Sequence, residues 1–313
     1  MRVLRLMLAS AVLMMSASAI AAADGSVYEE EIQRLLAWLP DDTESLIVLR
    51  DPDCHVVTEG GFATEMPCAS EGALSAIRGG KFRKRLSDCE TVVALQAAGG
   101  FREPTVVRGR TQYAGCQLVL FKEDIADTAK ALIKDMAAVS DGVLEIAGRR
   151  VLRFDEEWHR QKWTFLVSFP TPHVLIVATD EHYLRELLVR IDDSADATFV
   201  TNERLKAELP LDASFWVLRQ YKAKLRNEPG GSQGFLYRAT DWSDVDVIFV
   251  ADDDTPPKAV AAMWTLPAPL ETVPDVRHTG MGVFKVEYSF DERANYDVFW
   301  MLLLHHLGHQ ADL

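Results

Sequence analysis

The sequence predicts an α+β protein of two related halves, each with helices packed on a mainly antiparallel sheet. Three observations support this prediction. A segment that begins at Arg34 recurs at Arg204, the close of the first half recurs near the end of the chain, and helical patterns bracket runs of strands without regular βα alternation. Helices set apart from strand runs are typical of α+β folds. We interpret the recurrence as an internal duplication.

The repeated segment holds a helix end, a proline and a strand. Residues 34–50 read RLLAWLPDDTESLIVLR, and residues 204–219 read RLKAELPLDASFWVLR. With Glu44 left unmatched, ten of the seventeen positions are identical. Proline ends a helix because it has no N–H to donate and clashes with the preceding turn. The strand in the first copy is apolar almost without a break, which predicts that it is covered on both faces or is central in its sheet.

The ends of the two halves also match. Each has an apolar strand, then an acidic pair that begins at Asp180 or Asp291, then a helical pattern. Aspartate at a helix start accepts a hydrogen bond from an unpaired backbone N–H. The strands expected in the second half include DVDVIFVADDD, KAVAAMWTL and MGVFKVEYSF. Because the first half is the longer one, we expect an insertion in its early part, where all four cysteines lie.

The start of the chain is typical of a secretory signal peptide over residues 1–23. Arg2 and Arg5 precede an apolar stretch that ends in small residues, so cleavage is expected after Ala21 or Ala23. The apolar stretch is shorter than the ~20 residues that a membrane-spanning helix needs. We therefore expect a secreted or periplasmic protein with no integral membrane segment after signal cleavage.

The two halves meet at a polar stretch. Residues 192–203 read DDSADATFVTNE and form the natural boundary. We expect the first half, with its disulfide-stapled insertion, to cover residues 24–195, and the second, shorter half to cover residues 200–313.

The charge of the chain limits its partners. The formal net charge is −14 at pH 7, which would repel a phosphate backbone, so we expect no nucleic-acid partner. The most basic run, RGGKFRKR at residues 78–85, is short, and we interpret it as a solvated helix face. The expected partner is an unknown protein or small-molecule ligand.

Four cysteines in an exported chain predict disulfides. They are Cys54, Cys68, Cys89 and Cys116, and three pairings are possible. Cys54 and Cys68 bracket a polar, glycine-rich loop, whereas Cys89 and Cys116 each adjoin a strand-like run. We predict the bridges 54–68 and 89–116. No C-x-x-C is present, so a thioredoxin-like redox role lacks its motif.

One pentapeptide, GGSQG at residues 230–234, matches the G-x-S-x-G pattern of serine hydrolases. In that interpretation Ser232 is the nucleophile, His278 is the base, and Asp244 or Asp246 orients the base. The residues before the pentapeptide do not predict an apolar strand, however, and those after it do not predict a helix. A flexible loop is therefore the preferred interpretation.

His305 and His309 are one helical turn apart and are the candidate metal ligands. A catalytic zinc site needs a third ligand, and no H-E-x-x-H is present. Solvent-facing histidines near a helix C-terminus are the preferred interpretation, so we expect no bound metal. The sequence also lacks a G-x-G-x-x-G and a P-loop lysine, and we expect no cofactor.

The opening helix, LPxD turn and strand, together with ATDEHYLRELL at residues 178–188, resemble a group of uncharacterised exported bacterial proteins with no assigned activity. The resemblance implies export and duplication but no chemistry. The preferred function is that of an exported non-enzymatic binding or scaffold protein of the cell envelope or extracellular space. The alternative is a secreted serine hydrolase that uses the GGSQG loop.

Overall fold

The computed structural model describes most of the chain and divides it into two compact units. The N-terminal unit contains the described residues up to 199, and the C-terminal unit contains those from 200 onward. The expected signal peptide lies outside the described residues, which are 25–50, 73–74, 77–99, 105–107, 110–112, 114–158, 161–193, 199–211, 213, 215–220, 233–239, 244–266 and 273–290.

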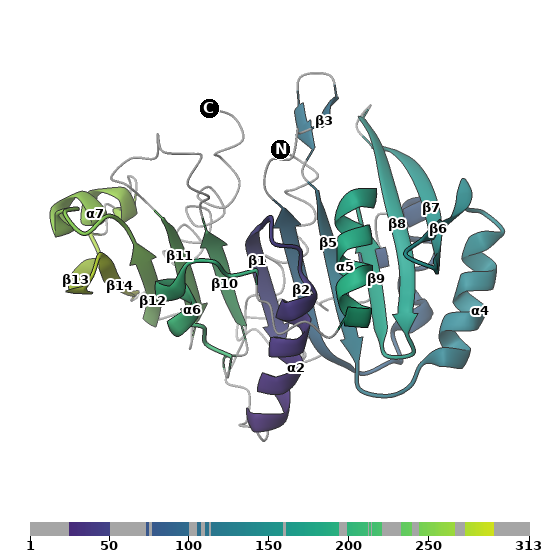
Figure 1. Cartoon of the computed structure of the whole chain (residues 1–313), viewed down its shortest axis with the longest axis horizontal. Coiled ribbons are helices and arrows are strands. Elements are labelled where there is room, and N and C mark those ends of the chain that lie inside the picture. The colour runs from purple at the N-terminus through teal and green to yellow at the C-terminus, as the bar shows by residue number, and fades with distance from the viewer. Residues whose placement is uncertain are drawn as a thin grey trace. The chain divides into compact units, whose positions relative to one another are not determined.

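The N-terminal unit is built on one antiparallel sheet (Figure 1), whose strand order is β1-β2-β5-β9-β8-β7-β6. Two short strands, β3 and β4, form a separate hairpin. The elements are α2 (Gly25–Trp38), β1 (Thr43–Arg50), the 3₁₀ turns η1 (Ile77–Gly80) and η2 (Arg83–Leu86), β2 (Thr91–Gly99), β3 (Thr105–Val107), β4 (Arg110–Gln112), β5 (Gly115–Phe121), α4 (Ala126–Ala137), β6 (Gly142–Ile146), β7 (Arg149–Trp158), β8 (Gln161–Thr171), β9 (Val174–Ala178) and α5 (Glu181–Asp193).

The C-terminal unit has a sheet of five antiparallel strands in the order β13-β14-β12-β11-β10. Its elements are α6 (Glu203–Ala207), β10 (Phe215–Gln220), β11 (Gly234–Ala239), β12 (Asp244–Val250), α7 (Pro257–Trp264), β13 (Asp275–Gly280) and β14 (Val283–Ser289).

The two sheets share one order of elements. In each unit three strands form an antiparallel meander, a helix follows, and a later strand returns to pair with the third strand of the meander. The returning strand is β9 on β5 in the N-terminal unit and β14 on β12 in the C-terminal unit. The N-terminal unit places four strands after its helix α4, and the C-terminal unit places two after α7.

Sheet dominates both units. The described residues hold twelve strands in these two sheets and five α-helices, of which α6 has only 5 residues and α7 only 8. The predicted α+β fold, with two halves of helices packed on a sheet, is therefore wrong, and the fold is a sheet-dominated antiparallel one.

Two local errors in the second half have clear causes. KAVAAMWTL, expected as a strand, belongs mostly to helix α7, because alanine favours a helix and Pro257 is suited to the first helical turn. DVRHTG, which shows no apolar pattern, is strand β13. A strand at the end of a sheet with exposed side chains lacks the apolar alternation by which strands are predicted.

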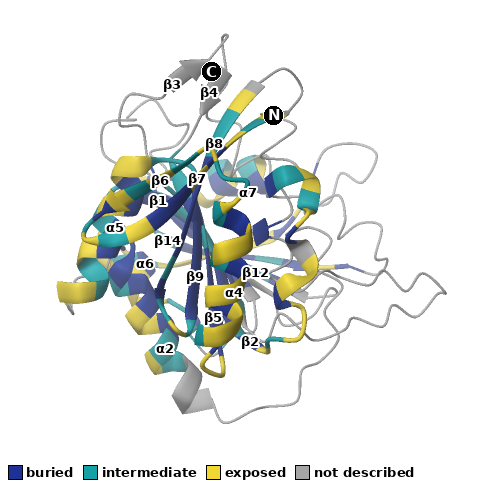
Figure 2. Ribbon diagram, turned by 90° about the vertical axis from the view of Figure 1, so that its right-hand side faces the viewer, coloured by how far each residue is buried: buried dark blue, intermediate teal, exposed yellow. Residues whose placement is uncertain are grey.

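The core of the N-terminal unit lies on both faces of its sheet. On β1, Leu46, Ile47 and Val48 are 0%, 7% and 0% exposed, so the prediction that this strand is covered on both faces is confirmed. Figure 2 shows α2 and α5 on one side of the strands and α4 on the other. Arg190 of α5 joins α5 to the end of α2, because it donates to the Leu39 carbonyl at 3.0 Å and pairs with Asp41 at 2.8 Å.

The core of the C-terminal unit centres on Trp264 at the end of α7. Its ring makes edge contacts with Phe235 of β11 and Phe249 of β12, at centroid distances of 5.4 and 6.0 Å. The Tyr288 hydroxyl of β14 donates to the Trp264 carbonyl. Helix α7 therefore covers the face of the sheet that carries these aromatic side chains, and the opposite face of β12, β14 and β13 carries charge.

Two strand glycines provide a matched test of the sheet register. A Cβ at Gly115 would lie 2.6 Å from the Ala97 carbonyl oxygen on β2, whereas one at Gly142 on β6 would meet no atom within 4 Å. We expect Gly115→Ala to lower the free energy of unfolding by about 1 to 3 kcal/mol, since backbone must move. Gly142→Ala should change it by less than about 1 kcal/mol, in the stabilising direction. Urea denaturation of both variants tests this, and equal effects would contradict the β2–β5 register.

Candidate functional site

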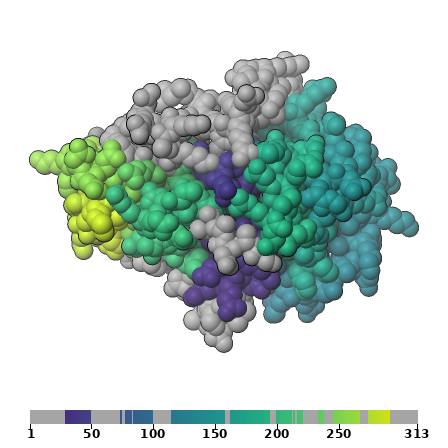
Figure 3. Space-filling model, in the orientation of Figure 1, coloured from purple at the N-terminus to yellow at the C-terminus, as the bar shows by residue number. Residues whose placement is uncertain are grey.

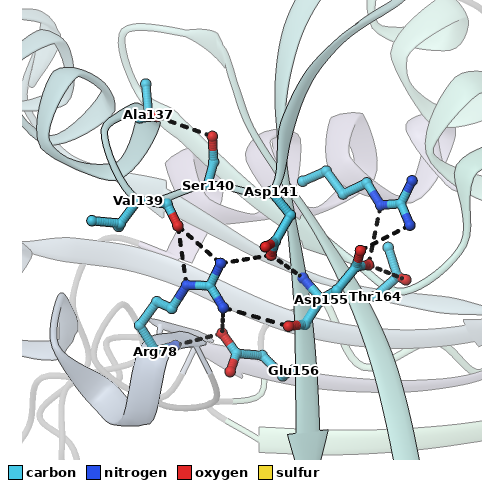
Figure 4. Close-up of polar contacts among 9 residues, drawn as sticks. Arg78, Ala137, Val139, Ser140, Asp141, Asp155, Glu156 and Thr164 are labelled. Atoms are coloured by element: carbon cyan, nitrogen blue, oxygen red, sulfur yellow. Dashed lines mark hydrogen bonds and ion pairs between the residues drawn. The ribbon is translucent and has the colours of Figure 1, made fainter.

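The densest polar cluster among the described residues surrounds Arg78 of η1 (Figure 4). Arg78, Gly79 and Gly80 have successive positive φ angles of 49°, 63° and 80°. Glycine adopts this left-handed region without strain, so the two glycines permit the tight turn. The turn places the Arg78 side chain over β7, with its guanidinium 5.5 Å from the centre of the Phe154 ring.

All three guanidinium nitrogens of Arg78 have protein acceptors. Nε and Nη2 donate to the Val139 carbonyl at 3.1 and 2.9 Å, and Nη2 also donates to Asp141 at 2.6 Å. Nη1 lies 3.4 Å from both the Asp155 carbonyl and the Glu156 carboxylate, which also accepts from the Arg78 backbone N–H at 2.7 Å. This fork of donors is therefore engaged in holding the turn against the sheet.

The carboxylate of Asp141 is held in its ionised form. Asp141 accepts from the Asp155 backbone N–H at 2.7 Å, and this bond, followed by the hydrogen bond from Arg78, lowers the pKa of Asp141. Arg153 donates to both oxygens of Asp155 at 3.1 and 2.9 Å, and Thr164 donates to it at 2.8 Å. We call Arg78 and its acceptors the clamp, because their contacts hold the η1 turn against the sheet.

The basic run at residues 78–85 is solvated at Lys81, Lys84 and Arg85, as expected, but it does not form one helix face. It forms two 3₁₀ turns, with Arg78 in the clamp and Arg85 paired with Asp135 of α4. Phe82 is 2% exposed and anchors the run in the core. Sequence spacing missed this arrangement because the acceptors of Arg78 lie 61 to 78 residues away along the chain.

The predicted Cys89–Cys116 bridge is not formed, and Cys116 is a free thiol. Along the β2–β5 ladder Thr91 lies opposite Phe121, and Ala97 lies opposite Cys116. Cys89 therefore precedes the end of β2 remote from Cys116, and six strand residues alone span about 20 Å. Bridged cysteines need Cα atoms within about 7 Å of one another. Cys54 and Cys68 lie outside the described residues.

Cys116 belongs to a buried polar group beneath α5. Burial raises the pKa of its thiol to about 12. Hydrogen bonds from the Ala97 backbone and the Tyr183 side chain act in the opposite direction but are weaker than the effect of burial. Tyr183 shares a hydrogen bond of 2.7 Å with the Thr43 hydroxyl. A buried neutral thiol is a poor nucleophile, so this group is structural. Asp180, at the start of α5, accepts from the Tyr183 backbone N–H at 2.8 Å, as predicted for a helix start.

The serine hydrolase residues are only partly described. Ser232 lies outside the described residues, but strand β11 begins at Gly234, where a nucleophile elbow would continue into a helix. His278 is on β13 and stacks on Phe284 at 4.7 Å. Asp244 begins β12, and the neighbouring Asp246 pairs with Lys285 at 3.4 Å. The sheet therefore separates His278 from β11 by two intervening strands, β14 and β12.

His305 and His309 also lie outside the described residues. Within the part of the chain that the structure describes, no group of three or more His, Cys, Asp or Glu side chains could hold a metal ion.

The sequence missed a second polar array, which crosses β12, β14 and β13. Glu287 of β14 lies opposite Asp246 on one side and Asp275 on the other, and Lys285 lies opposite Arg277. Lys285 pairs with Glu287 at 2.7 Å, and Arg277 pairs with Asp275 at 2.9 Å and with Glu287 at 3.3 Å. These acids raise the pKa of both cations. The hydrogen bond to Glu287 is the main cause for Lys285, and the hydrogen bond to Asp275 is the main cause for Arg277.

The clamp around Arg78 predicts a difference between arginine and lysine. We expect Arg78→Ala to lower the free energy of unfolding by about 1 to 3 kcal/mol, because several part-buried acceptors lose their donor. Arg78→Lys should recover only part of this, since an ammonium cannot reproduce the fork. Arg185→Ala, which removes an exposed ion pair on α5, should change stability by less than about 0.5 kcal/mol. Thermal and urea denaturation measure all three, and full rescue by lysine would contradict the clamp.

Burial of Cys116 predicts that its reactivity depends on unfolding. Iodoacetamide should leave Cys116 unmodified in the folded chain at pH 7 and at pH 9, because a thiol with a pKa near 12 stays neutral at both. In denaturant the same residue should be fully alkylated. Peptide mass spectrometry under non-reducing conditions provides the measurement. Rapid labelling of folded Cys116, or a peptide that joins it to Cys89, would contradict the structure.

Comparison with known protein families, with characterised proteins and with solved structures found no match in any of the three. Among the described residues, none of the helices combines the length and the apolar character that crossing a membrane requires.

Proposed function

We propose that the chain is an exported, non-enzymatic binding or scaffold protein of the cell envelope or extracellular space, and that strand β13 is the part through which it binds. The signal-peptide pattern over residues 1–23 supports export. The commitment of Arg78 and its acids to the clamp, and the burial of Cys116, support a structural role for these groups.

The observation that supports the proposal most directly is that β13 is an exposed strand at the edge of its sheet. It is the last strand in the order of the C-terminal sheet (Figure 1), and within the described residues its outer edge pairs with no strand. Most of its side chains are exposed, and the β13–β14 hairpin reaches the surface in Figure 3, coloured yellow. Val273 and Met281, which flank the strand, are 66% and 76% exposed.

An open strand edge of this kind is suited to binding by strand addition. Its backbone N–H and C=O groups can pair with an extended segment of a partner, while neighbouring side chains select that segment. Proteins otherwise shield such edges because they invite pairing with other chains. The partner is therefore a polypeptide with an extended segment. Of the two kinds of partner expected from the sequence, a protein or a small molecule, this is the protein.

Site-specific photo-cross-linking tests the proposal. A photo-reactive residue replaces Thr279, which is exposed at the end of β13, or, as the control, Lys130, whose side chain is 76% exposed on α4. We expect defined polypeptide adducts, identified by mass spectrometry, from position 279 and none from position 130.

Two results would contradict the proposal. Equal adducts, or none, at both positions would remove β13 as the binding edge. Labelling of Ser232 by a fluorophosphonate probe, abolished by Ser232→Ala, would replace the non-enzymatic function with the serine hydrolase alternative.

A further inference from the structure

The charges on β13 are poorly matched to the strand beside it. Asp275 lies directly opposite Glu287 of β14, and Arg277 lies directly opposite Lys285. Like charges that face each other across an antiparallel pair are destabilising. The attractive contacts run diagonally between strands, as from Arg277 to Glu287, or along one strand, as from Arg277 to Asp275. The order of charges along β13 therefore does not favour its pairing with β14.

The same order is complementary to itself. When two β13 strands run antiparallel about a two-fold axis at Val276, Asp275 of each copy lies opposite Arg277 of the other. Val276 then meets Val276, and Val273 lies opposite Thr279. Moving the axis to Arg277 would instead place two arginines face to face. Several registers would join the two sheets with their charged faces on the same side. Charge selects the one with its axis at Val276.

We propose that β13 pairs with β13 of a second copy of this chain, antiparallel, with the two-fold axis at Val276. The inference rests on the proposed function, because it names the partner of the same strand edge. The side chains that would form the new pairs are accessible, since Asp275 is 60% and Arg277 66% exposed. A two-fold interface uses one patch on both copies, as this register requires.

The geometry of β13 also limits the strength of pairing. Its register with β14 shifts between His278 and Gly280, so the regular part of the strand is short. A bulge bends the strand and interrupts regular pairing beyond it. A short strand pair buries far less surface than a permanent dimer needs, so association should be reversible and dependent on concentration. Salt should weaken it, because exposed charges set its register.

Charge exchange on β13 tests the register. Sedimentation equilibrium of the full chain, over a range of concentrations, is measured for wild type, Asp275→Arg, Arg277→Asp and the double variant. Each single change places like charges opposite each other twice across the axis and should weaken self-association by about tenfold or more. The double variant restores opposite charges in the same register and should return association to near the wild-type level.

Two controls separate pairing from folding. Asp275→Arg places an arginine opposite Glu287 within the chain but loses the Asp275–Arg277 contact, so its thermal midpoint should stay close to that of wild type while association falls. Lys130→Asp, on α4, should leave association unchanged.

The outcomes distinguish this inference from the proposed function. A chain that stays monomeric at every concentration, or a double variant that stays as weak as the single ones, would overturn pairing of β13 with itself. Cross-links from position 279 to a different polypeptide would then leave the proposed function standing. Equal association in all four chains would place the self-contact elsewhere on the molecule.

Discussion

Each unit of this protein depends on the strand that joins its opening meander to the returning strand. In the N-terminal unit β5 lies between β2 and β9, and in the C-terminal unit β12 lies between β11 and β14. A slip of one residue along such a strand would turn every side chain to the other face of the sheet. The register of β5 places Cys116 beneath α5 and brings Gly115 against the backbone of β2. The register of β5 therefore determines where Cys116 and Gly115 lie.

The features that the sequence predicted correctly depend on neighbours in the chain. The apolar run of β1 indicated a strand covered on both faces, and Asp180 indicated the start of α5 through its bond to the Tyr183 N–H. Both signals lie within a few residues of the structure that they specify. Local patterns were sufficient for them because a helix start and a buried strand are local requirements.

The features that the sequence did not predict depend on pairing between distant strands. The Cys89–Cys116 bridge had suitable neighbours at both cysteines, yet the β2–β5 register holds them at opposite ends of the ladder. Strand β13 has no apolar period, so neither it nor the charged array across β14 was visible beforehand. Arg78 stood in a basic run with no sign of its distant acceptors. Sheet was underestimated because β13 is polar and because the interior strand β11 was not expected from the sequence.

The two polar arrays differ in how well their charges are matched. Around Arg78 each nitrogen of the one cation faces an acceptor, and a satisfied network of this kind makes a structure rigid. On β13 the facing charges are alike, and the attractive contacts run diagonally or along one strand. Local conflict in an otherwise consistent fold is expected at functional sites. The edge strand β13 is therefore a stronger candidate for a binding site than the cluster around Arg78.

The contact between Arg190 and the end of α2 bears on the order in which the chain folds. Arg190 reaches the Leu39 carbonyl across 151 residues of sequence, and β9 returns to β5 only after three intervening strands have formed. Contacts this distant in sequence slow folding, since the intervening chain must first be ordered. During synthesis, which starts at the N-terminus, helix α2 can contact α5 only after α5 has been made. The contact between α2 and α5 therefore needs the whole of the intervening chain, and a chain truncated before α5 would lack it.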